Sequence, residues 1–195
     1  RLVQGKPPDG TTRFNWLSLV RYWDKAGTAD GGAYTVGALM GLSKPPIVGY
    51  KVSGVPMYDG APLVWILHIV RGQWAAGERE QVIRRTAQRD GKFVRIGLEQ
   101  EPGSGGKESV QASARLLIGH RVTAERPTGD KISRAEPLAD QMTLRNVHIA
   151  EEGTWVHDLL DELRFWPHST YKDQGDALAG AFNMLTKPRR KVGAM

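Results

Sequence analysis

The apolar residues of this chain follow two kinds of spacing, and the spacing changes after about residue 75. Segments 13–23, 33–40 and 63–70 are short runs rich in aromatic and branched side chains, a pattern typical of strands. Short connections join them, so we expect three antiparallel strands in succession. Segment 44–62, which precedes the third of them, is rich in Pro and Gly and predicts an exposed loop or a small hairpin.

Helical spacing dominates the rest of the chain and alternates with short apolar runs. We expect strands at 94–98, 121–125 and 147–150, and helices at 76–89, 107–118, 132–143, 155–164 and 173–185. Thr154 is expected to cap the helix that follows it. This order predicts an α/β fold: a mixed sheet, antiparallel in its first three strands and then parallel, flanked by helices. It is the order of the ribonuclease H-like fold.

The chain of 195 residues fits one domain. We expect that domain at 13–186, preceded by a linker or flexible lead-in at 1–12 and followed by a basic tail at 187–195. The chain begins with Arg rather than Met, which favours an excised domain or a processed product.

Acidic residues end or begin elements that lie far apart in the sequence. Asp24 ends the first strand, Glu99 ends the strand after the first helix, and Asp173 and Asp176 lie in the first turn of the last helix. Ligands of open α/β sheets gather outside the carboxyl ends of the strands, so these carboxylates are candidates for a common site. Glu101 and Asp30 are weaker candidates: we interpret Glu101 as a neighbour of the site and Asp30 as a turn residue.

Clustered carboxylates repel one another unless a cation lies between them. Carboxylate oxygens suit Mg²⁺ or Mn²⁺, and two such ions can support phosphodiester hydrolysis. The catalytic candidates are therefore Asp24, Glu99 and Asp173, with Asp176 as a further metal ligand in place of, or beside, Asp173. The competing interpretation is structural, because an Asp after a strand is usually a turn residue and acids at a helix N-terminus interact favourably with the helix dipole.

The segment GSGGK at 103–107 resembles a phosphate-binding loop. A Walker motif needs Ser or Thr after the Lys and Gly at position 101, but Glu108 and Glu101 stand there, so we expect no ATPase activity. Backbone N–H groups at this helix start, together with Lys107, are candidates to hold a DNA phosphate. Lys131 and Arg134 are further DNA-contact candidates because their loop follows a strand of the sheet.

The chain has 27 Lys and Arg against 21 Asp and Glu, a net charge of +6, which favours an anionic partner such as nucleic acid. It has no Cys, so disulfides and thiolate metal sites are excluded. No apolar run is long enough for a membrane helix, and no signal peptide opens the chain, so we expect a soluble, cytoplasmic protein without membrane contact.

Four segments together resemble the C-terminal nuclease domain of the large terminase subunit of tailed bacteriophages. They are RYWDKAGT at 21–28, LEQEPGSGGK at 98–107, GDKISRA at 129–135 and KDQGDAL at 172–178. The resemblance spans residues 13–186. It implies that Asp24 bridges two metal ions and that Glu99 is the second acid. The family often pairs acids in the closing helix, but Lys172 precedes Asp173 here, so the resemblance leaves Asp173 and Asp176 open and we favour Asp173.

The resemblance also implies a function: a metal-dependent endonuclease that cuts concatemeric viral double-stranded DNA during packaging, in the cytoplasm of the infected bacterial host. Its implied partners are an N-terminal packaging ATPase domain, the portal protein and the small terminase subunit. Two alternatives stay open. One is another ribonuclease H-like nuclease of the resolvase or integrase type. The other is a DNA- or portal-docking module without catalytic activity, whose acids are structural.

Overall fold

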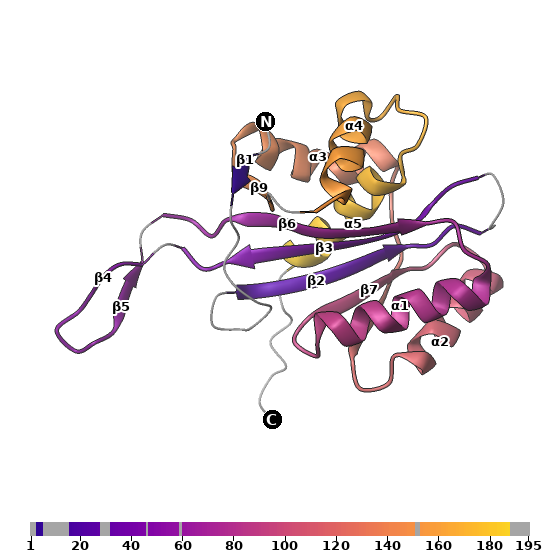
Figure 1. The fold of residues 1–195 in the computed structure, drawn as a ribbon, viewed down its shortest axis with the longest axis horizontal. Helices are drawn as coiled ribbons and strands as arrows, with labels where there is room; N and C mark the ends of the chain where they lie inside the picture. Colours follow the sequence, from indigo (N-terminus) through magenta and orange to yellow (C-terminus); the bar gives the residue numbers. More distant parts are fainter. Residues whose placement is uncertain are drawn as a thin grey trace.

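The computed structural model describes residues 3–5, 16–27, 32–45, 47–58, 60–150 and 153–187 (Figure 1). Seven strands form one sheet in the order β1-β9-β6-β3-β2-β7-β8. Their bounds are β1 Val3–Gly5, β2 Trp16–Asp24, β3 Thr35–Ser43, β6 Val64–Gly72, β7 Arg95–Glu99, β8 Arg121–Glu125 and β9 Val147–Ala150. The helices are α1 Ala76–Asp90, α2 Ser104–Leu116, α3 Lys131–Thr143, α4 Trp155–Phe165 and α5 Asp173–Thr186.

The direction of the strands matches the expectation from the sequence. β3 pairs antiparallel with β2 and with β6, whereas β7 lies parallel to β2 and β8 lies parallel to β7. β9 and β1 extend the sheet in parallel on the other side of β6. The prediction of an α/β mixed sheet of ribonuclease H-like order is confirmed.

Helices cover both faces of the sheet (Figure 1). Side chains along a strand point alternately to the two faces, and those of β2 are buried at nearly every position, so both faces need a cover. On one face, Val20 and Tyr22 pack in the same apolar cluster as Leu178 and Phe182 of α5. On the other face, Trp23 packs in a cluster with side chains of α1 and α2. In Figure 1 α5 lies behind the centre of the sheet and α1 and α2 lie on the opposite side. β2 is thus fixed from both sides, and its carboxyl end is held in place.

Three local expectations need correction. The helix expected from residue 107 begins at Ser104, so the glycines belong to its first turn, and the positive φ of Gly103 (92°) marks the turn that leads into it. Thr154 occupies the N-cap position, but it has helical backbone angles and its side chain makes no capping hydrogen bond. Residues Val3–Gly5, expected in a flexible lead-in, form β1 because β9 offers a free edge. Beyond Lys187, the expected basic tail lies outside the described residues.

The Pro- and Gly-rich segment forms the expected hairpin, with strands β4 (Ile47–Tyr50) and β5 (Pro56–Tyr58) pairing antiparallel. It connects β3 to β6 and projects from the end of the sheet opposite the carboxyl end of β2 (Figure 1). The hairpin is therefore remote from the acidic residues considered below. No helix in the described part of the chain is long and apolar enough to cross a membrane.

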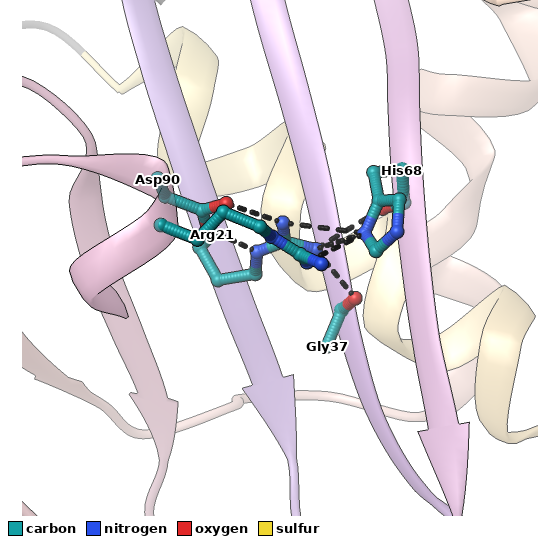
Figure 2. Close-up of polar contacts among 5 residues, drawn as sticks. Arg21, Gly37, His68 and Asp90 are labelled. Atoms are coloured by element: carbon teal, nitrogen blue, oxygen red, sulfur yellow. Dashed lines mark hydrogen bonds and ion pairs between the residues drawn. The ribbon is translucent and has the colours of Figure 1, made fainter. Parts of the chain in front are cut away.

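Arg21 is a buried cation in the middle of β2, and its side chain is 1% exposed (Figure 2). Its guanidinium donates to both carboxylate oxygens of Asp90, at 2.7 and 2.9 Å, and to the carbonyl oxygens of Gly37 and His68. Desolvation lowers the pKa of Arg21, and the facing Asp90 carboxylate counteracts that effect. The pair joins the end of α1 to the centre of the sheet.

His68 gives this cluster a pH dependence that can be measured. Burial first, and then the charges of Arg21 and Arg89, lower its pKa from 6.5 to about 4. Between these values the unfolded chain binds the proton and the folded chain does not, so stability is lost as pH falls from 7 towards 4. Because His68 is partly exposed, we expect a loss of only about 1 kcal/mol between pH 7 and pH 5. Urea unfolding of wild type and His68→Gln at both pH values checks this; an equal pH dependence of the two proteins would contradict it.

Candidate active site

Four carboxylates come from three elements that meet at one edge of the sheet. Asp24 is the last residue of β2, and Glu99 is the last residue of β7, the parallel neighbour of β2. Asp173 and Asp176 lie in the first turn of α5, which packs on β2 and β3. The sheet register and the position of α5 therefore bring all four candidates from the sequence together.

The charges of these groups act on one another. The pKa of Asp24 rises from 3.8 to about 8, first because the carboxyl group is buried and then because of the charges of Glu99, Asp176 and Asp173, while the Lys131 ammonium opposes the rise. A carboxyl group with such a pKa is poised to exchange its proton for another cation near neutral pH.

Glu99 is held by two neighbours. The Tyr22 hydroxyl donates to its Oε2 at 2.9 Å, and the Arg134 guanidinium lies 3.4 Å from its Oε1. The Tyr22 ring fits against two glycines: a Cβ at Gly97 would lie 2.7 Å from the ring, and one at Gly180 would collide with it. These glycines let β7 and α5 approach β2 closely enough for Tyr22 to reach Glu99.

The carboxylates of α5 have different partners. Asp173 accepts a hydrogen bond from the backbone N–H of Tyr34 at 2.9 Å. Asp176 is 2% exposed and forms an ion pair through Oδ2 with the Lys131 ammonium. Asp176 has one buried carboxylate oxygen, Oδ1, without a hydrogen-bond partner among the described residues. Buried polar atoms of purely structural residues are usually hydrogen-bonded.

Asp24 and Glu99 line an open pocket of about 190 Å³ together with Gly105 and Gly106. Gly105 and Gly106 belong to the first turn of α2, and the buried side chain of Lys25, which is 6% exposed, fixes α2 beside the pocket. Lys25 donates to the hydroxyls of Ser109 and Ser113 of α2 at 2.7 and 3.1 Å, and burial lowers its pKa. The N-terminus of α2 therefore faces the carboxylates across the pocket.

The remaining candidates fall around the same pocket. Glu101 also lines it, whereas Lys107 is exposed on the first turns of α2. Lys131 and Arg134, predicted as DNA contacts on a loop, lie instead in the first turn of α3, because Asp130 caps the helix there. Each forms an ion pair with a carboxylate of the site. Asp30 lies outside the described residues.

Among the described residues, no three acidic or histidine side chains are close enough together to hold a metal ion as they stand. The donor chemistry nevertheless fits, because four hard carboxylates converge, one oxygen of Asp176 is unpaired, and an ammonium group already occupies the other. Lys131 is thus the cation that already balances the charge of Asp176 in the structure.

Tyr22 and Lys25 were not among the site residues predicted from the sequence. The period of two along a strand could have identified Tyr22, because it lies on the same face as Asp24. Lys25 directly follows Asp24, but its partners on α2 lie 84 and 88 positions away and leave no local signal.

Comparison with solved structures gives the same fold, although neither the family models nor the curated proteins compared with this chain gave a match. The large terminase nuclease of thermophilic phage G20c with bound zinc aligns with a TM-score of 0.57 at 17% identity, over 93% of this chain and 92% of that one. Its magnesium-bound form gives 0.57 at 14% identity with the same coverage. The human cytomegalovirus terminase nuclease domain, soaked with manganese, gives 0.60 at 12% identity, over 89% and 85%. The chain thus has the fold of terminase nuclease domains.

Proposed function

We propose that this chain is a metal-dependent endonuclease that cleaves concatemeric viral double-stranded DNA during genome packaging, by two-metal hydrolysis of the phosphodiester bond. The observation that carries the proposal is the convergence of Asp24, Glu99, Asp173 and Asp176, where burial and then the charges of the other three carboxylates raise the pKa of Asp24 to about 8. Its fold is that of terminase nucleases solved with zinc, magnesium or manganese, which adds support.

In this proposal Asp24, Glu99 and Asp173 would hold two Mg²⁺ or Mn²⁺ ions, with Asp176 as a further ligand in place of, or beside, Asp173. When bound, such ions would activate the attacking water and stabilise the leaving oxygen. Tyr22 keeps Glu99 in position through its hydrogen bond. Lys131 and Arg134 neutralise carboxylates in the metal-free protein, and we infer that they turn towards DNA phosphates when cations replace them. Lys107, exposed at the α2 N-terminus, would contact DNA beside the pocket.

The proposed setting follows from the resemblance described above. The protein would act in the cytoplasm of the infected bacterial host, with a packaging ATPase domain, the portal protein and the small terminase subunit as partners. The net charge of +6 suits a DNA substrate and predicts that binding weakens as salt increases.

Nicking of supercoiled plasmid in Mn²⁺, Mg²⁺ or EDTA tests the proposal. We expect the wild type to nick DNA with metal and not with EDTA, and Asp24→Ala to lose about 10²-fold or more of the rate while it still binds DNA. Asp140→Ala, which removes an exposed acid of α3, is the matched control and should retain activity. Circular dichroism verifies that both variants fold.

The outcomes separate the alternatives. Equal nicking by wild type and Asp24→Ala would reject this site, and absence of nicking in every metal would favour the docking module. A strong preference for four-way junctions over plain duplex would favour the resolvase type of nuclease.

A further inference from the structure

A second pocket of about 410 Å³ lies on the other side of Glu99, beyond the end of β8. Tyr22 and Arg134 line this pocket, and both also bind the carboxylate of Glu99. Its remaining wall comes from the residues after β8 and from the second half of α5. The pocket thus borders the candidate active site through Tyr22 and Arg134, and none of the four candidate metal ligands lines it.

The charge of this pocket is opposite to that of the acidic site. Arg126, Arg134 and Lys187 contribute three cationic side chains, and Glu125 contributes one acid. Glu125 forms an ion pair with Lys187, and Arg134 faces Glu99, so the local charge remains positive. A positive pocket beside a cluster of carboxylates suits an anion that must lie close to them.

Neighbouring side chains hold two guanidinium groups that line the pocket, those of Arg126 and Arg134. The buried Nε of Arg134 has no hydrogen-bond partner among the described residues. The Gln100 side chain orients the guanidinium of Arg126. With the amide oxygen and nitrogen of Gln100 exchanged, as their neighbours require, the oxygen accepts from Nε and Nη2 of Arg126 at 3.1 and 3.2 Å. Gln100 is itself buried, directly after Glu99. The residue that directly follows β7 therefore holds Arg126 in position, where its guanidinium can donate to a bound ligand. Guanidinium groups are well suited to phosphate.

We propose that this pocket, formed around Arg126, Arg134 and Lys187, binds a backbone phosphate of the DNA strand next to the phosphodiester that is cleaved. The inference rests on the proposed function, since it names a substrate contact of the same site. It adds Arg126 and Lys187 as DNA-binding residues and gives Arg134 a phosphate as its second partner. Holding a neighbouring phosphate would fix the register of the strand over the carboxylates.

Binding of a fluorescent 30-base-pair duplex in EDTA, at a series of salt concentrations, tests the pocket without cleavage. We expect Arg126→Ala and Lys187→Ala each to weaken binding by up to about tenfold at low salt and to reduce the salt slope by about one. Arg126→Lys should keep most of the slope because it keeps the charge. The matched controls are Arg115→Ala in the last turn of α2 and Lys92→Ala after α1, exposed cations away from the pocket, which should change binding little.

The results separate this inference from the proposed function. If the wild type nicks plasmid with metal but both pocket variants bind like the controls, the phosphate pocket is wrong and the nuclease proposal stands. If the pocket variants lose affinity but the wild type nicks DNA in no metal, the pocket stands as a DNA contact and the nuclease proposal fails. Both positions are at the surface, and circular dichroism excludes unfolding as a cause.

Discussion

Replacing Asp24 by Asn is expected to stabilise the metal-free protein by roughly 1–3 kcal/mol at pH 8, even though it removes the proposed activity. Asp24 is enclosed beside Glu99, Asp176 and Asp173, and its pKa rises from 3.8 to about 8. The folded protein therefore binds a proton that the unfolded chain releases, and stability is lost as pH rises from about 4 to 8. An amide keeps the shape of the carboxyl group without the charge, so it relieves the repulsion.

Thermal and urea unfolding of wild type and Asp24→Asn in EDTA, at pH 5 and pH 8, measure this effect. The gain should be larger at pH 8 than at pH 5, and Mg²⁺ or Mn²⁺ should stabilise the wild type more than the variant. Asp140→Asn is the control for an exposed acid. If Asp24→Asn is less stable than wild type at pH 8, the Asp24 carboxylate stabilises the folded protein, and the expected destabilisation by burial and charge repulsion is wrong.

Replacing Asp90 by Ala is expected to destabilise the protein by about 3–5 kcal/mol, because it leaves the buried Arg21 charge without its main partner. Arg21 is 1% exposed and donates twice to Asp90, so water cannot replace the lost acceptor. The end of α1 would lose its attachment to β2. Urea unfolding at pH 7 provides the free energy of unfolding.

A double-mutant cycle isolates the pair from the packing around it. Arg21→Met in the Asp90→Ala background removes the unpaired charge and should recover a large part of the lost stability. If the double variant is no more stable than Asp90→Ala alone, the loss comes from packing at the end of α1 and the ion pair is not its cause.

Local sequence patterns were enough to predict the strands and helices and the acids at their ends, because the positions of both depend on residues close by in the sequence. Alternating apolar residues identify a strand, and acids at the ends of parallel strands must share one edge of the sheet. Asp24 and Glu99 could therefore be grouped from the sequence alone. The same reasoning identified the start of α5, and with it Asp173 and Asp176.

Side-chain partners were beyond that reasoning, because tertiary packing selects them. Nothing near Arg21 indicates Asp90, which is 69 positions away. Lys131 and Arg134 were recognised only as basic residues on a loop, since their partners Asp176 and Glu99 come from other elements. The error at Thr154 has a different origin: residue type favours a capping bond, but the backbone is already helical there.

The close fit of Tyr22 between β7 and α5 also has a kinetic consequence. Tyr22 and Glu99 are 77 positions apart, and Gly180 lies further along the chain. The contact can form only after a long loop has closed and the last helix has docked, and such non-local contacts form slowly. We therefore expect the carboxylates of Asp24, Glu99, Asp173 and Asp176 to come together late during folding. Under the proposed function, chains truncated before α5 would neither hold cations nor cut DNA.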